Sequence, residues 1–105
     1  MTTCSTHVLD VALGRPAAGM RAHLRGPGGD VSVFGVTDAD GRLRFDAELT
    51  AGIHQITFDT GEWFSEAGRE TLFPFVALTF TVEAGEHYHV PLLLSPYSYT
   101  TYRGS

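Results

Sequence analysis

The residues best able to move a proton near neutral pH are five histidines: His7, His23, His54, His87 and His89. His87 and His89 stand two apart in strand-like sequence, so both rings project from the same face. Such a pair could bind zinc with His7 as a third ligand, or one ring could act as a metal-free general base on water. The residue pattern leaves both readings open. His23 and His54 lie in ordinary strand patterns, and we interpret them as packing or surface residues.

Arg42 is a second candidate for chemistry, because it follows the turn sequence TDADG at 37–41. In such a turn Asp side chains cap backbone amides, and Gly41 takes the left-handed conformation before the next strand. An arginine fixed at a strand start offers a rigid cationic fork for a planar carbonyl or oxyanion. It could equally be an ordinary solvated side chain.

Other chemistries lack support in the sequence. There is no Gly-x-Ser-x-Gly elbow, no reactive-thiol motif surrounds Cys4, and the glycines at 26, 28 and 29 lack the Lys-Ser/Thr of a phosphate loop. Covalent and nucleotide-dependent mechanisms are therefore not indicated.

Composition narrows the function further. Seven basic residues against twelve acidic ones leave a net charge of -5, the wrong sign for binding nucleic acid. No apolar run approaches the roughly 20 residues that span a bilayer, so we expect no membrane partner. A single cysteine, with no disulfide framework and no signal-peptide pattern, favours a cytoplasmic location.

The elements that must position these side chains are mostly strands. Gly and Pro recur at short intervals, separated by runs rich in β-branched and aromatic residues. We expect strands near 5–12, 20–25, 31–37, 42–46, 53–59, 74–83, 87–95 and 98–102. One short helix is predicted at 61–68, with Gly68 as its stop. This pattern predicts a single domain over residues 1–105, an all-β sandwich of two antiparallel sheets.

Two features are not explained by an isolated sandwich domain. The segment Val90–Leu94 is apolar on both faces, which predicts that another subunit covers part of the surface. The chain also closes on the tyrosines Tyr97, Tyr99 and Tyr102 beside Arg103, where most chains fray.

Five motifs together resemble the transthyretin-related 5-hydroxyisourate hydrolases across the whole chain: STHVLD at 5–10, GRPAAG at 14–19, TDADGR at 37–42, HYHVPLLLSPY at 87–97 and YRGS at 102–105. The YRGS ending is the most specific of them, because it marks the enzyme branch and is lacking in the hormone-carrying transthyretins. The stretch 26–35 departs from the pattern, being shortened between the second and third strands.

The resemblance implies a transthyretin-like (prealbumin-like) β-sandwich of two four-stranded sheets with one short helix. It also implies a homotetramer whose two dimers form by edge pairing of the last strands and face each other across a channel. No metal or organic cofactor is implied.

The reaction implied by the resemblance is hydrolysis of 5-hydroxyisourate to 2-oxo-4-hydroxy-4-carboxy-5-ureidoimidazoline in urate degradation. His7 and His89 would hold and deprotonate water, Arg42 would bind the carbonyl edge and the oxyanion, and Tyr102 and Ser105 would line the pocket. His87 is expected to lie outside the site, either supporting it or as a surface residue. The alternatives are a transthyretin-like small-molecule carrier and a non-catalytic β-sandwich binding module.

Overall fold

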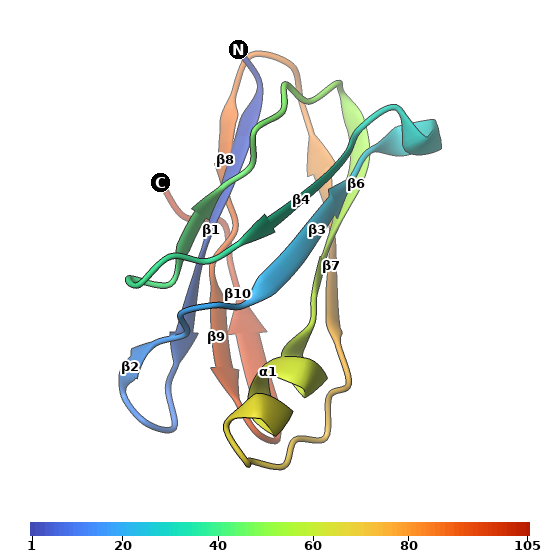
Figure 1. Ribbon diagram of the computed structural model, residues 1–105. Helices are drawn as coiled ribbons and strands as arrows, with labels where there is room; N and C mark the ends of the chain where they lie inside the picture. The colour runs from blue at the N-terminus through green and yellow to red at the C-terminus, as the bar shows by residue number, and fades with distance from the viewer.

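A computed structural model describes all residues from Met1 to Ser105 and shows two packed β-sheets with one short helix (Figure 1). The strands are β1 (Thr3–Asp10), β2 (Arg15–Pro16), β3 (Arg21–Arg25), β4 (Ser32–Val36), β5 (Arg42–Arg44), β6 (Gly52–Phe58), β7 (Val76–Val82), β8 (His87–His89), β9 (Leu92–Ser95) and β10 (Ser98–Thr101). The helix is α1 (Thr60–Glu66), and a 3-10 turn, η1 (Pro27–Gly29), follows β3. The predicted sandwich and its helix are confirmed.

Strand β1 is the spine of the first sheet. Antiparallel β5 and β2 pair with one of its edges, while β8 and β9 run parallel along the other edge. Antiparallel β10 extends the sheet beyond β9. The sheet thus has six strands. If β8 and β9 are counted as one interrupted strand, it has the four strands β5, β1, β8/β9 and β10, plus the two-residue β2.

The single strand predicted at 87–95 is wrong in detail, because it is interrupted between β8 and β9. The interruption falls at Val90 and Pro91. Proline has no N–H to give to the ladder, so the pairing with β1 stops and resumes after it. The Val90 N–H still reaches the carbonyl of Ser5 at 2.9 Å, which keeps both pieces in register with β1.

The expectation of purely antiparallel sheets is also wrong. The whole second sheet lies between β1 and β8 in the sequence, so it forms a crossover long enough to bring β8 back parallel to β1. Strand pairing this distant in sequence leaves no local signal.

The second sheet has the order β4-β3-β6-β7 and is antiparallel throughout. Between the two sheets lies one core of 19 buried apolar residues. Alternation along β1 places Cys4 and Val8 in this core, together with the buried Thr6. Ser5 and His7 therefore point to the opposite, outer face of the first sheet.

Helix α1 covers one end of the sandwich, next to the far end of β1 (Figure 1). Gly68 has a positive φ of 68°, the left-handed conformation predicted for the helix stop. Arg69 then returns to Asp10 at the end of β1 with an N–O distance of 2.6 Å. At seven residues, α1 is too short to cross a membrane, and no other helix has the length and apolarity to do so.

Candidate active site

The site is built on the outer face of the first sheet, where strand register decides which side chains meet. Ser5 of β1 pairs with His89 of β8 on one edge and with Arg44 of β5 on the other. Two residues along β1, His7 pairs with Arg42. Directly paired residues project from the same face of a sheet, so these five side chains share one surface.

The turn before β5 holds Arg42 in place. One carboxylate oxygen of Asp38 accepts the N–H groups of Asp40 and Arg42, each at 2.9 Å. Gly41 has a φ of 77°, and a Cβ there would collide with the carbonyl oxygen of Val8. The predicted capped turn with a left-handed glycine is therefore confirmed.

His7 is oriented by the same turn. Its Nε2 lies 2.8 Å from the carbonyl oxygen of Asp40, so Nε2 carries the proton and donates it to this acceptor. The Nδ1 of a neutral His7 ring then keeps its lone pair.

His89 is half-buried, as is His7, whereas His87 is exposed. Burial lowers the pKa of His89 below the ordinary histidine value, and the positive charges of His7, His87 and Arg42 lower it further. The ring is therefore neutral at neutral pH, the state in which a histidine can accept a proton.

A serine that sequence reasoning missed joins the two histidines of β8. The Oγ of Ser5 lies 2.8 Å from Nδ1 of His89 and 2.9 Å from Nε2 of His87. The Nδ1 of His87 in turn lies 2.6 Å from Oγ1 of Thr3. The signal that could have found Ser5 is its place two residues before His7, on the same strand face.

The end of the chain lies against His89. Gly104 donates its N–H to the carbonyl oxygen of His89 at 2.8 Å and forms an isolated antiparallel bridge with it. A Cβ on Gly104 would lie 2.5 Å from Cδ2 of the His89 ring, closer than real Cβ contacts. Glycine is thus the residue that lets the tail approach this ring and bring Ser105 to the site.

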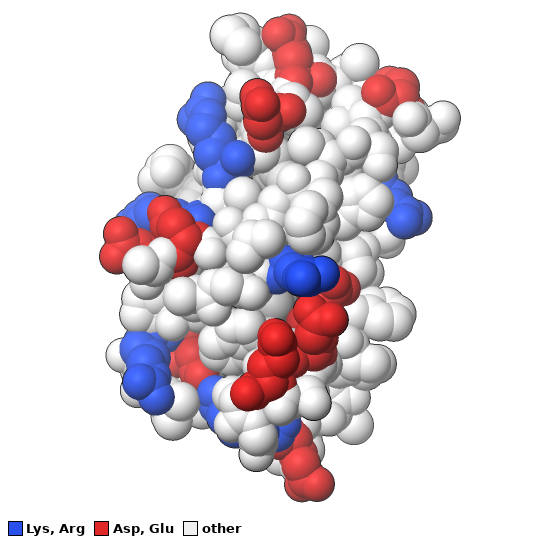
Figure 2. Space-filling view, in the orientation of Figure 1, with Lys and Arg blue, Asp and Glu red and all other residues white.

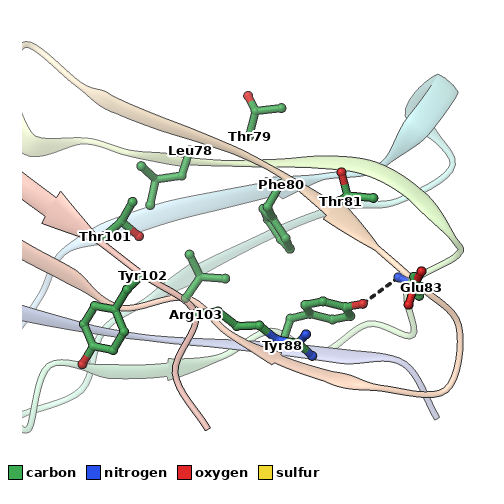
Figure 3. A pocket seen from close by; sticks show the side chains of 10 residues that line it. Leu78, Thr79, Phe80, Thr81, Glu83, Tyr88, Thr101, Tyr102 and Arg103 are labelled. Atoms are coloured by element: carbon green, nitrogen blue, oxygen red, sulfur yellow. Dashed lines mark hydrogen bonds between the residues drawn. The ribbon is translucent and has the colours of Figure 1, made fainter.

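Arg103 anchors that tail. Its Nη2 lies 2.9 Å from Oε1 of Glu86, and its guanidinium carbon lies 4.4 Å from the centre of the Tyr88 ring. Tyr88 is fixed in turn, because its hydroxyl accepts the N–H of Glu83 at 2.7 Å. Figure 3 shows Arg103 extending toward Tyr88, whereas Tyr102 points away from it.

Sequence-predicted residues divide between two depressions in the surface. One is lined by Ser105, Arg42 and His89, together with Ser5, Thr6, Leu43, Arg44 and His87. His7 does not line this depression, but it pairs with Arg42 across β1 and β5 and its charge acts on His89. Tyr102 is instead exposed and lines a separate, more apolar depression between β7 and the tail (Figure 3). Within one chain the structure thus gathers four of the five predicted residues and leaves Tyr102 apart.

The charge of the depression opposes that of the chain. Two arginines, Arg42 and Arg44, line it together with two histidines, and no Asp or Glu side chain does. The chain as a whole has a net charge of -5, and on the face drawn in Figure 2 acidic and basic side chains alternate without forming a basic track. The depression is therefore suited to a small electron-rich ligand with carbonyl oxygens.

Metal and thiol chemistries have no matching geometry. No group of three or more His, Cys, Asp or Glu residues is placed to hold a metal ion, and His7 is directed at Asp40. Burial of Cys4 raises the pKa of its thiol to about 12, so the thiolate is absent near neutral pH.

A neutral His89 ring beside a second imidazole and a fixed guanidinium can deprotonate a bound water and stabilise the oxyanion that forms when it adds to a carbonyl. This site on the outer face of a transthyretin-like sandwich defines the class of protein. The chain belongs to the HIUase/Transthyretin family, whose model matches residues 4–104.

Known relatives lie in both branches of the family. A 5-hydroxyisourate hydrolase 2 from Rhizobium meliloti is 43% identical over 96% of this chain and 94% of its own length. The structure of the Klebsiella pneumoniae 5-hydroxyisourate hydrolase covers 100% of this chain and 94% of its own, with 41% identity and a TM-score of 0.89. Transthyretin from Sparus aurata covers 96% and 95%, with 28% identity and a TM-score of 0.83.

Proposed function

We propose that this protein catalyses the hydrolysis of 5-hydroxyisourate to 2-oxo-4-hydroxy-4-carboxy-5-ureidoimidazoline, a step of urate degradation. The observation that carries the proposal is the convergence of His7, Arg42 and His89 on one face of the first sheet, beside Ser105. Relatives named as 5-hydroxyisourate hydrolases, about 40% identical over nearly the full chain, support it.

His89 is the general base. Its Nδ1 is hydrogen-bonded to Ser5, so Nε2 is the ring nitrogen left to accept a proton from water. The low pKa of His89 keeps this nitrogen free, at the cost of a smaller driving force for taking the proton. His7 holds the same water through its free Nδ1.

Arg42 binds the carbonyl edge of the substrate. The water oxygen adds to a carbonyl carbon of the six-membered ring, and negative charge grows on the carbonyl oxygen. A fixed guanidinium is worth most at this step, because its charge needs no reorganisation. Collapse of this adduct breaks the ring C–N bond, and the departing nitrogen takes a proton.

The tail completes the pocket. Ser105 lines it beside His89, and Gly104 sets the distance between the tail and the ring. We assign Tyr102 a place in the site of the assembled protein, since it lies outside the depression of its own chain.

The assembly is a homotetramer. Strand β10 lies at one edge of the first sheet and β7 at one edge of the second, and all four residues of β10 are exposed. An unpaired edge invites pairing with a second copy, and closed pairing removes the hazard. The dimers formed in this way would bring their outer sheet faces, and hence their sites, to a shared channel.

The protein acts in the cytoplasm under this proposal. The single cysteine is a buried free thiol, as suits a reducing compartment.

The competing function is a carrier of apolar aromatic ligands, as in the transthyretin branch. One solved neighbour, sea bream transthyretin, is a complex with thyroxine. Arginines and histidines line the present site, and a channel of this kind disfavours an apolar guest.

The test is to generate 5-hydroxyisourate in situ with urate oxidase and to follow its ultraviolet absorbance with and without this protein. We expect decay well above the enzyme-free blank, and no thyroxine binding by calorimetry at the same protein concentration. Decay at the blank rate together with tight thyroxine binding would favour the carrier.

A further inference from the structure

A continuous chain of hydrogen-bonding groups runs from the candidate base to an exposed histidine. It passes from Nδ1 of His89 to Oγ of Ser5 (2.8 Å), then to Nε2 of His87 (2.9 Å), and from Nδ1 of His87 to Oγ1 of Thr3 (2.6 Å). Each link lies within hydrogen-bond distance. His89 is half-buried at one end, and His87 is exposed near the other.

The serine in the middle has one proton for two neighbours. Its hydroxyl can donate to only one imidazole and must accept from the other. If Ser5 donated to His89, the proton of that neutral ring would sit on Nε2, where a base needs its lone pair. If Ser5 donates to His87, Nδ1 of His89 carries the proton and Nε2 is free.

We propose that Ser5 and His87 are positioning residues that hold His89 in its Nδ1–H form and carry the proton it gains out to His87. The inference rests on the proposed role of His89 as the base. In the resting chain His89 donates to Ser5, Ser5 donates to His87, and His87 donates to Thr3.

The transfer balances along the chain. Nε2 of His89 takes a proton from water while its Nδ1 proton passes to Ser5 Oγ, and the serine proton passes to Nε2 of His87. His89 and Ser5 each give up one proton as they receive one, whereas His87 keeps the proton it receives, so the net positive charge ends on His87. Reversal of the same steps returns the proton to His89, which can then protonate the departing ring nitrogen of the substrate.

The surroundings favour His87 as the end of this route. Charges from His7 on β1 and Arg42 on β5 disfavour a cation on His89, which is also partly shielded from water. Arg44 and Ser105 complete the ring of groups around the depression. His87 is exposed, and hydration there stabilises an imidazolium better than a half-buried position does.

The first test is the tautomer of His89, read from ring nitrogen chemical shifts of ¹⁵N-histidine-labelled protein above pH 7.5. We expect the Nδ1–H form in the wild type. In Ser5→Ala we expect the Nε2–H form to gain population, because the Nδ1–H form loses the serine oxygen that accepts its proton. Ser5→Thr keeps a hydroxyl on a strand-compatible side chain and should restore the wild-type form.

The second test is the rate of 5-hydroxyisourate hydrolysis by the same proteins. We expect Ser5→Ala to lower kcat by about 10-fold or more, as loss of a tautomer-setting partner does, with KM changed less than about threefold. Ser5→Thr should recover most of the rate. His87→Leu, which removes the acceptor of the serine proton, should also lower kcat.

The matched control is Ser32→Ala. Ser32 Oγ lies 2.8 Å from Nε2 of His23, so the control breaks a serine–histidine hydrogen bond of the same kind on the second sheet. It should leave both kcat and the His89 tautomer unchanged. Thermal melting of every variant reports whether the fold is retained.

The outcomes separate this inference from the proposed function. A wild-type kcat in Ser5→Ala, with or without a change of tautomer, would overturn the relay, as would an Nε2–H form of His89 in the wild type. A wild-type rate in His89→Ala would instead contradict the base itself, while the tautomer measurement still reports on the hydrogen-bonded chain.

Discussion

A histidine works as a base only while it is unprotonated, and the surroundings of His89 set the pH at which that holds. Burial and three neighbouring cationic groups all act in one direction on its pKa, downward. Under the proposed mechanism Arg42 has two effects in one place, since it binds the substrate edge and its charge adds to the lowering of the His89 pKa. The two roles follow from a single guanidinium because β5 places it opposite His7 on the same sheet face.

The pH dependence of hydrolysis should reflect this shift. The base form of His89 is present above its lowered pKa, so activity is lost only as pH falls through that value. We expect the acidic limb of kcat/KM to lie below the ordinary histidine pKa of about 6.5. Initial rates in buffers from pH 5 to 8, each corrected for the enzyme-free blank, measure it. An acidic limb above that value would show that the pKa of the base is not lowered, contrary to what the burial of His89 and its charged neighbours imply.

At the scale of elements, the tail is held by contacts that lie outside the site. Arg103 bonds Glu86 just before β8 and lies over Tyr88 within it, so these contacts tie the tail to the strand that carries His89. Removing the guanidinium should loosen Gly104 and Ser105 without unfolding the sandwich.

We expect Arg103→Met to lower kcat/KM by about 10-fold, since misplacement by an ångström costs that much or more in an oriented site. The matched control is Arg21→Met. Arg21 also makes a surface ion pair, with Glu62 at 3.4 Å, and lies over a ring, Phe34 at 6.0 Å, but on the second sheet. Equal activity of the two variants would show that the anchor of the tail is dispensable.

The end of β1 is held by a buried ion pair. Burial opposes ionisation of Asp10, but hydrogen bonds from Arg69 and from the Leu13 N–H outweigh it and lower the pKa of the carboxyl. Arg69 also lies 4.8 Å from the centre of the Phe64 ring, which couples α1 to the sheet.

Arg69→Met should therefore lower the free energy of unfolding by about 3 kcal/mol at pH 7, because it leaves a buried carboxylate unpaired. Asp10 has a lowered pKa in the folded state, so its contribution is present above the unfolded value of about 3.9 and is lost as pH falls below it. Urea unfolding at pH 7 and pH 3 should show the gap between variant and wild type narrowing at the lower pH. A constant gap would mean that the lost stability is packing alone.

Features of the site that depend on residues close in sequence could be predicted, whereas those that depend on residues far apart in sequence could not. Period-two alternation places His87 with His89, and the turn chemistry of Asp38 and Gly41 fixes Arg42, so both were open to sequence reasoning. The break at Pro91 was visible in principle, because a proline cannot donate to a ladder. The parallel pairing of β8 with β1 was not, since it depends on a register between segments more than eighty residues apart.

Ser5 was absent from the predicted site, whereas Tyr102 was predicted to line it and lies apart from it within one chain. The serine stands on the same strand face as His7, and its role emerges only when β8 is docked beside it. The tyrosine belongs to the most specific motif of the chain, yet in one chain it lines a different depression. Under the proposed tetramer, the place of Tyr102 depends on contacts between chains, which no motif within one chain encodes.

At the scale of the whole molecule, the main open feature is a pair of sheet edges, β7 and β10, that have no partner strand within the chain. Strands β7 and β10 both border the depression between β7 and the tail, so a second copy could pair with both edges at once. We expect sedimentation velocity at micromolar concentration to give four times the 11.4 kDa chain mass. A monomer that retains full activity would contradict a site completed by assembly.

The most direct test of the central claim compares 5-hydroxyisourate decay in the wild type with decay in His89→Ala, Arg42→Ala and His7→Ala, using His23→Ala as the control on the other sheet. We predict that the wild type and the control accelerate decay equally. Each of the three site variants should lose about 100-fold or more in kcat/KM while keeping its oligomeric state. Wild-type acceleration that survives all three substitutions would place the chemistry elsewhere and contradict the account.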